Sequence, residues 1–389
     1  MPTWSNTMQN PPSVGGTGLQ SLFKRPATGL FLLALPFSYV PRLVEGDTQP
    51  WPLLAVLILF LMNRSAKTMT RLDLILIGSV LGAMLVFFAR AGFGVEMLRF
   101  GYKMFVFTLL WVCVPALPVG LVVRGMKSVI LIWFLFGMFQ TLALQLGISI
   151  EIGGRFVEGR SGVPSLAPEP SLFGILSLLA LYYLVISKQK ISPIYHAMAF
   201  ANVFMSGSIL AILAGSLFIL LTPWRVRILF ALIAVPLVIY LLNYSEAFFL
   251  NRIQRILSEG LEWRILLLDY SINLRVGHVV YTLWSSFPAA LMLQTVPDFE
   301  TAYNSWAAGT AYFYPTESSF ILTGAGSVIY RGGIFGVFIL GALLVRAHRS
   351  NVEHGYVKLA ILIFLLLAQL GISSTFIMLF AVQNFNVRK

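Results

Sequence analysis

Two stretches of this 389-residue chain combine charged and polar side chains in patterns suited to binding phosphate. The first stretch, residues 149–170, holds Arg155, Arg160 and Glu169 among glycines and prolines. A guanidinium group is planar and permanently charged, so it grips phosphate oxygens with paired hydrogen bonds. Glu169 lies between two prolines, which keep its backbone extended, and Ser171 is expected to cap the next helix. The same residues also suit a solvated loop that ends in a helix cap.

The second stretch carries Ser271, Arg275 and His278, whose spacings of four and three place them on one face of a helix. A single histidine is usually structural, but the neighbouring Arg275 favours a binding site. Further along, Arg331 lies inside an apolar segment, where an ionisable side chain is costly and indicates function by default. Extension of this side chain to the membrane surface is the alternative, and Glu317 is a candidate partner.

The composition predicts a membrane protein around these stretches. Hydrophobic residues make up 58% of the chain and charged residues 11%, against roughly 25% charged in a soluble domain. Apolar runs long enough to cross a bilayer core of roughly 30 Å recur along the sequence. We expect an all-α, polytopic transmembrane helix bundle with 11 spans, or 12 if the last one divides; the short pair 193–206 and 207–222 also suits a hairpin. The expected spans are 27–44, 50–63, 73–90, 101–123, 127–148, 171–187, 193–206, 207–222, 227–243, 321–345 and 356–382.

The basic residues predict the orientation of these spans. With the N-terminus in the cytoplasm, most basic residues in the short loops fall on the inner side, as the positive-inside rule requires. Residues 149–170 and 244–320 then become two outward-facing periplasmic loops. Residues 1–23 are interpreted as a disordered cytoplasmic tail and 24–389 as a single transmembrane domain. The inner basic residues are Lys24, Arg25, Arg64, Lys67, Arg71, Arg124, Lys127, Lys188, Lys190, Arg225, Arg227, Arg346, Arg349 and Lys358.

The same sequence argues against several classes of function. The formal charge of +12 is distributed between the spans, so it indicates topology and no nucleic-acid partner. The chain has no glycine-rich phosphate loop, no CxxC pair and no HExxH motif, and we expect neither a metal nor a cofactor. The single cysteine, Cys113, lies in an apolar run, which indicates a small buried residue.

The order of these motifs resembles that of one bacterial family. The segments Arg160-Ser-Gly162 and Glu169-Pro-Ser171 resemble the first periplasmic loop of O-antigen and exopolysaccharide repeat-unit polymerases. Residues 269–278 are similar to the second loop of that family, residues 206–215 to its serine-rich mid-chain helix, and residues 324–336 to the span that closes the second loop. The likeness covers residues 150–345, and the spacer between Gly162 and Glu169 departs from the pattern.

The resemblance implies a metal-independent glycosyltransferase of the bacterial inner membrane with its active site facing the periplasm. The implied donor is a growing glycan on undecaprenyl pyrophosphate, and the acceptor is one lipid-linked repeat unit. Arginines would neutralise the diphosphate leaving group, and Glu169 or, less favourably, His278 would accept the proton of the attacking hydroxyl. A chain-length-regulating membrane protein and membrane lipid are the expected partners. The implied catalytic residues are Glu169, Arg160, Arg275 and His278, and the implied substrate-binding residues are Arg155, Gly162, Ser171, Ser271, Glu317 and Arg331.

Three other functions remain open. An O-antigen ligase transfers the same donor to lipid A core, shares the fold, and also relies on an outer-loop histidine and arginine. The Glu-Pro-Ser segment at 169–171 favours the polymerase. A transporter or flippase for polysaccharide or lipid-linked sugar predicts inverted repeats and charges in mid-span, and the sequence shows no convincing sign of either. A structural scaffold explains the chemistry of neither loop.

Overall fold

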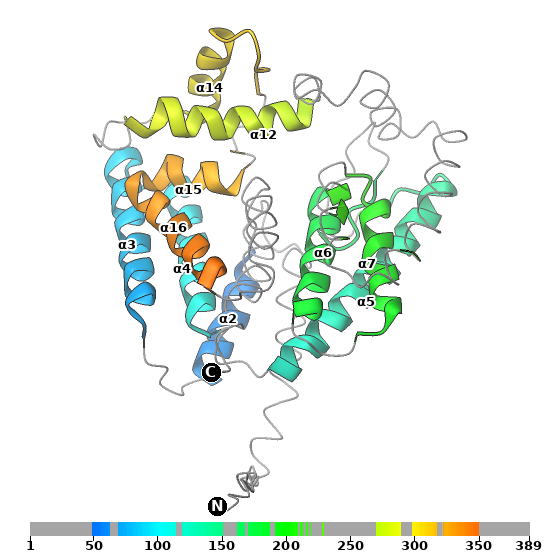
Figure 1. Cartoon of the computed structure of the whole chain (residues 1–389). Helices are drawn as coiled ribbons and strands as arrows, with labels where there is room; N and C mark the ends of the chain where they lie inside the picture. Colours follow the sequence, from blue (N-terminus) through cyan, green and yellow to red (C-terminus); the bar gives the residue numbers. More distant parts are fainter. Residues whose placement is uncertain are drawn as a thin grey trace, which may run out of the picture.

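The computed structural model describes a chain of helices (Figure 1). The described residues are 49–62, 69–113, 119–150, 162–167, 170–186, 191–208, 270–288, 298–316, 321 and 323–349, with a few positions between 211 and 228. Every regular element among them is helical, which confirms the all-α class for this part of the chain. The predicted tail 1–23, the spans 27–44 and 356–382, and nearly all of 227–243 lie outside the described residues.

The body of the molecule contains two groups of helices (Figure 1). The first group comprises α2 (Pro50–Met62), α3 (Arg71–Ala91), α4 (Val95–Cys113), α15 (Gly324–Gly332) and α16 (Ile334–Arg349). The second comprises α5 (Val119–Gln145), α6 (Pro170–Ile186) and α7 (Pro193–Met205). Within the first group α3 packs against α4, α15 and α16, and α2 packs against α4. Within the second, each helix packs against the other two.

Helix α3 begins and ends where local chemistry requires it. The Thr70 hydroxyl accepts a hydrogen bond from the Asp73 N–H, and the Asp73 carboxylate accepts one from the Thr70 N–H, which completes a capping box. The other Asp73 oxygen accepts a hydrogen bond from Trp111 Nε1 of α4 at 2.6 Å. The cap therefore also joins two helices. The helix ends at Gly92, whose φ of 70° favours glycine.

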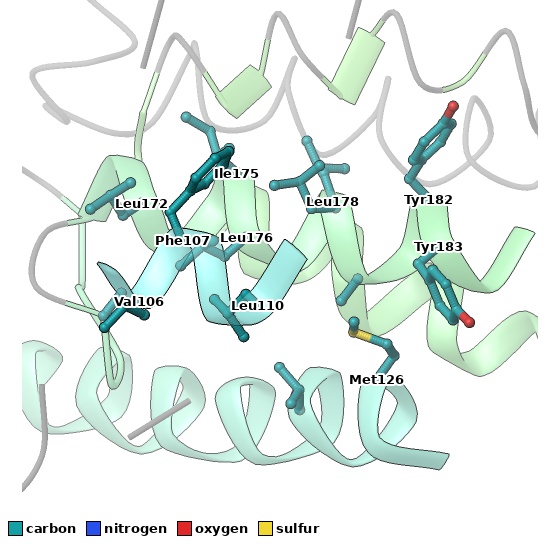
Figure 2. Packing of buried hydrophobic residues seen from close by; sticks show 14 of the residues in the cluster. Val106, Phe107, Leu110, Met126, Leu172, Ile175, Leu176, Leu178, Tyr182 and Tyr183 are labelled. Atoms are coloured by element: carbon teal, nitrogen blue, oxygen red, sulfur yellow. The ribbon is translucent and has the colours of Figure 1, made fainter. Parts of the chain in front are cut away.

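One apolar cluster of buried residues joins the two groups of helices. A core is defined by such a contiguous set of contacts between buried apolar side chains. Cys113 is buried at the end of α4, which confirms its predicted place. Figure 2 shows part of the core, with Val106, Phe107 and Leu110 from α4, Met126 from α5, and Leu172, Ile175, Leu176 and Leu178 from α6.

Helices from the second predicted loop cover one end of the molecule, which we call the capped end. Helix α12 (Tyr270–Tyr281) continues into the π-helical turn η2 (Thr282–Ser286), and α14 (Phe299–Ala308) follows. Helix α12 lies across the end of α3 and runs alongside α15, and α14 lies beyond it (Figure 1). Both α12 and η2 pack against α15, and α14 packs against α12. The predicted helix carrying residues 271–278 is confirmed.

Two helices, Arg71–Ala91 and Gly120–Gln145, are long and apolar enough to cross a membrane, and shorter apolar helices cover Leu172–Val185 and Ile334–Val345. The sides of the two long helices that face away from the core are also apolar; Leu85 of α3, for example, is 68% exposed. A helix that is apolar all round is typical of a membrane span or a fully buried core helix. No more than half of each apolar window is buried, so these exposed faces suit contact with lipid. The exposed apolar side chains are Leu74, Ile75, Leu81, Leu85 and Phe88 on α3 and Leu131, Leu135, Met138, Phe139, Leu142 and Leu144 on α5.

The predicted span 101–123 is wrong because it joins parts of two helices. Helix α4 begins earlier, at Val95, and ends at Cys113, and α5 begins at Val119. The intervening sequence contains Pro115 and Pro118, which have no backbone N–H to donate within a helix. Helix α5 consequently begins before the predicted span 127–148 and includes the basic residues assigned to the loop between them.

Two further boundaries differ from the prediction. The span 321–345 is divided at Gly333, whose φ of 56° and ψ of −133° end α15 before α16 begins. Arg331 is therefore in the last turn of a short helix and not inside a continuous span. Ser171 is the second residue of α6, which begins at Pro170, so the predicted N-cap position of Ser171 is wrong by this assignment. Proline is favoured in the first turn because its missing N–H has no partner there anyway.

Candidate functional site

His278 lies in a cluster of aromatic side chains at the capped end. Its ring is fully buried and packs edge-on against Phe299 at 4.9 Å and Tyr303 at 4.6 Å between ring centroids. Edge-to-face packing stabilises aromatic pairs beyond the burial of apolar area. The cluster joins α12, α14 and α15, and we call it the aromatic cluster. Its other members are Tyr281, Trp306, Phe313 and Tyr330.

The surroundings of His278 keep its ring neutral at physiological pH. Burial, and secondarily the positive charge of Arg275 one turn earlier on α12, lower the pKa of His278 to about 4. A general base works best with a pKa near the operating pH and must reach the proton that it accepts. A fully buried imidazole with this pKa meets neither condition. The geometry therefore favours a packing role for His278 over the predicted catalytic role.

Two asparagines tie the segment after α14 to the cap helices. Asn273 Nδ2 donates to the Tyr312 carbonyl at 2.7 Å, and Asn273 Oδ1 accepts from the Tyr314 N–H at 2.9 Å. Asn304 makes the same paired contact with Thr316, at 2.8 Å to its carbonyl and 2.7 Å from its N–H. A side-chain amide can donate and accept at the same time, so each asparagine satisfies one backbone carbonyl and one backbone N–H of this segment. Residues 312–316 are thereby fixed against α12 and α14.

Arg331 bridges α15 and the start of α4. Its Nη2 donates to the Glu96 carboxylate at 2.8 Å, and Nη1 lies 3.4 Å from the Ser327 hydroxyl. The guanidinium carbon lies 5.7 Å from the centre of the Phe87 ring and 6.0 Å from that of Phe100, within cation–π range. The side chain is only 13% exposed. Arg331 therefore does not simply extend into solvent.

A second arginine, Arg90 in the last turn of α3, contacts α15 at Tyr330, the residue before Arg331. It is buried, and its Nη1 donates to the Tyr330 carbonyl oxygen at 2.7 Å. Because the Tyr330 ring belongs to the aromatic cluster, Arg90 links that cluster to α3. A buried cation is costly unless it is paired with acceptors, and this contact supplies one of them.

The arginines of this region form what we call the cationic cluster: Arg90, Arg99 and Arg331 with the single acid Glu96. Within residues 90–99 and 324–333, three arginines and one glutamate leave a formal charge of 3 − 1 = +2. Glu96 is half exposed and contacts both Arg331 and Arg99, the latter at 3.4 Å. An arriving phosphate oxygen could take the place of this carboxylate at Arg331. The net positive charge of the cluster therefore favours an anion at the capped end.

The end of the first predicted loop is buried between α5, α6 and α7. The Val163 N–H donates to the Met205 carbonyl at 2.9 Å, and a Cβ at Gly162 would collide with the Ser206 carbonyl oxygen. The Ser165 hydroxyl donates to the Trp133 carbonyl at 2.9 Å, from a backbone with a φ of 52°. Gly162 thus has a packing reason to be glycine, which accounts for it without a substrate contact. The loop end is a structural part of the bundle.

No family model, curated protein or solved structure matches this chain. Among the residues that the structure describes, no group of three or more His, Cys, Asp or Glu side chains is arranged to hold a metal ion. The chemistry of the candidate site is therefore argued from its own side chains.

The structure brings together only some of the residues predicted from the sequence. Arg275 and His278 lie one turn apart on α12, and Arg331 lies on α15, which packs against α12. The remaining predicted residues are not placed: Arg155, Arg160, Glu169 and Glu317 lie outside the described residues, as do the side chains of Ser171 and Ser271. Their roles stay predictions.

Sequence reasoning missed several residues that shape the site. Arg90 had a usable signal, because a basic residue at the very end of an apolar span is typical of an interfacial position. Glu96 had a weaker signal, as an acidic residue on the predicted outer side, six residues after Arg90 and three before Arg99. Asn273 and Asn304 had none, since their partners are backbone atoms that only the tertiary fold brings near.

Proposed function

We propose that this chain polymerises undecaprenyl-pyrophosphate-linked oligosaccharide repeat units at the periplasmic face of a bacterial inner membrane. The observation that carries the proposal is the cationic cluster at the capped end. Arg331 lies where the apolar helix α3 ends and α4 begins, so it would meet a headgroup whose lipid tail runs along the bundle, and the buried Arg90 beside it would hold α15 in place. A lipid-linked diphosphate needs both a cationic surface for its phosphates and an apolar surface for its lipid tail.

The arrangement of charges supports a polytopic protein with the capped end outside. Arg71 begins α3, and Arg346 and Arg349 end α16, at the end opposite α12 and α14. Lys127 near the start of α5 lies over the ring of Tyr195 at the start of α7. Basic residues thus gather at the uncapped ends of several helices, as expected for the cytoplasmic side. This supports an orientation with the predicted second loop in the periplasm.

The proposed reaction is a displacement at the anomeric carbon of the donor sugar. A hydroxyl of the acceptor repeat unit attacks that carbon, its new C–O bond forms, and the bond to undecaprenyl diphosphate breaks. The departing diphosphate gains negative charge, which Arg331 in the described structure and Arg160 in the predicted loop would stabilise. Glu169 is the proposed acceptor of the hydroxyl proton. No metal or cofactor takes part in this scheme.

The described residues favour the polymerase over the ligase and the transporter. The ligase hypothesis depended partly on an outer-loop histidine, and His278 is fully buried among aromatic rings. The transporter hypothesis predicts charges in mid-span, whereas the buried charges of α3, Asp73 and Arg90, lie in its first and last turns. Both charges also have hydrogen-bond partners that belong to the fold.

The lipid-linked glycans of cells that lack this protein distinguish these functions. A polymerase predicts that only single repeat units accumulate on undecaprenyl pyrophosphate and reach the cell surface. Lipid-linked polymer that never reaches lipid A would instead identify a ligase. Repeat units confined to the cytoplasmic leaflet would identify a flippase.

A further inference from the structure

We propose that Gln140 of α5 is a positioning residue that joins the two ends of the first predicted periplasmic loop. Its Nε2 donates one hydrogen bond to the Ile150 carbonyl oxygen at 3.0 Å and a second to the Ser165 carbonyl oxygen at 3.3 Å. Ile150 lies just after α5, and Ser165 lies shortly before α6. Gln140 is therefore in contact with both the beginning and the end of the loop. The catalytic meaning of this contact rests on the proposed function, but the contact itself does not.

The chemistry at this position requires an amide nitrogen. Both partners are carbonyl oxygens, which only accept hydrogen bonds, so the side of the amide that faces them must be the NH₂ group with its two donors. The two distances also mean that the carbonyl oxygens of Ile150 and Ser165 cannot lie more than 6.3 Å apart. The Gln140 side chain is 0% exposed, so it cannot touch a substrate. It acts through the loop that it joins.

The end of the loop is anchored independently of Gln140. The Ser165 hydroxyl bonds to the Trp133 carbonyl on α5, and the Val163 N–H bonds to the Met205 carbonyl at the end of α7, both at 2.9 Å. Gln140 adds the one described side-chain contact that reaches both ends. Because residues 162–167 are anchored, this contact also holds Ile150, at which the loop begins, in a fixed position relative to them.

The residues between these two contacts include Arg155 and Arg160, and Glu169 follows soon after them. A loop whose ends are held together has fewer conformations to lose when it binds a substrate. Without this contact, the predicted catalytic side chains would spend less time in a productive arrangement. Misplacement of this kind lowers the rate of the chemical step more than it weakens binding.

The test is hydrogen–deuterium exchange of the purified full-length protein in lipid nanodiscs, read over residues 151–161. Gln140→Glu keeps the size of the side chain but, when ionised, has no hydrogen to donate. Gln140→Met also lacks donors and is an apolar side chain of similar length, suited to a buried position if the carboxylate prevents folding. Thr141→Val is the matched control, since the neighbouring Thr141 hydroxyl bonds only within its own helix, to the Gly137 carbonyl at 2.8 Å.

We expect exchange over residues 151–161 to be about tenfold faster in a Gln140 variant, corresponding to the loss of an ordinary hydrogen bond, and unchanged in Thr141→Val. Glycan extension by the same variant should show a kcat lowered up to about 10²-fold with KM little changed. Unchanged exchange in a folded Gln140 variant would overturn the proposal. Faster exchange in a protein whose wild type extends no glycan would leave the contact standing and reject the polymerase instead.

Discussion

At the scale of single residues, the two arginines beside α15 differ in what they can offer a substrate. Arg331 is paired with Glu96, a side chain that is half exposed and free to move away when an anion arrives. Arg90 is buried and bonded to a backbone carbonyl that cannot leave. We therefore assign contact with the diphosphate to Arg331 and support of α15 to Arg90.

Arg331→Lys should lower glycan extension by roughly 10- to 100-fold, the worth of a hydrogen bond to a charged group. Lysine keeps the charge but loses the planar fork that reaches two oxygens at once. The measurement is the rate of extension at equal protein level in membranes. Arg124→Lys is the control, because Arg124 is exposed at the uncapped end and bonds only to the Gly120 carbonyl of its own helix. Equal rates for both variants would remove Arg331 from the site.

His278 predicts how stability depends on pH. Its pKa is lowered from 6.5 to about 4, first by burial and then by Arg275. Between these values the unfolded chain binds a proton that the folded protein does not, so stability rises with pH across this window and falls as the pH drops toward 4. Melting temperatures measured in detergent between pH 4 and 7 should therefore rise less steeply for His278→Gln than for the wild type. Identical slopes would show that His278 does not titrate in this way.

The residue scale also shows what sequence reasoning can reach. The helical face shared by Arg275 and His278 followed from their spacing, and the cost of a charge in an apolar segment pointed to Arg331. The aromatic cluster around His278 could not be predicted, because Phe299 and Tyr303 belong to a helix more than twenty residues away in the sequence. Burial of a polar side chain depends on such distant partners, and the hydrophobic periodicity of a local segment does not identify them.

At the scale of helices, the break between α15 and α16 places Arg331. Residues 321–345 have a continuous apolar pattern that predicts one span, but Gly333 adopts a backbone with positive φ that ends the first helix. Gly336 then packs against the Val328 carbonyl so closely that a Cβ would collide with it. The two helices therefore meet at a sharp bend, and Arg331 lies beside that bend. Glycines in apolar helices are common in membranes, which is why the sequence alone did not reveal the break.

Gly333→Ala should destabilise the protein by about 1–3 kcal/mol, the cost of a residue held in a disfavoured backbone region. Gly341→Ala provides a matched control in α16, because a Cβ there meets nothing within 4 Å. Alanine at this helical position should be neutral or stabilising by about 0.5–1 kcal/mol. Thermal unfolding of the two purified variants gives the comparison. Equal melting temperatures would mean that the bend at Gly333 is not required.

At the scale of the whole molecule, the helices are apolar on faces that do not contact the core. Composition predicted such faces, since 11% charged residues is far below the roughly 25% of a soluble domain. The number of spans was harder to predict from the sequence than the apolar faces, because prolines and glycines divide apolar runs without changing their average hydropathy. The division of 101–123 between α4 and α5 is one case, and the division of 321–345 is another.

Leu81, exposed midway along α3, tests whether that face meets lipid. Leu81→Asp should reduce the amount of protein in washed membranes, since an aspartate at the centre of a span costs about 2.5–3.5 kcal/mol on insertion. Phe93→Asp changes an apolar residue that is more exposed than Leu81, in the turn between α3 and α4 at the expected membrane surface, and should have little effect. If Leu81→Asp accumulated as well as Phe93→Asp, the face of α3 would not be in contact with hydrocarbon.

The central claim, that this protein joins lipid-linked repeat units, is tested most directly by glycan extension with purified components. The wild-type protein in liposomes is given undecaprenyl-pyrophosphate-linked repeat units from its own host, without nucleotide sugars or added divalent metal, and the products are separated by length. We predict a ladder of products that differ by one repeat unit, strongly reduced by Arg331→Ala and absent without protein. Repeat units that remain single with correctly folded wild-type protein would contradict the account.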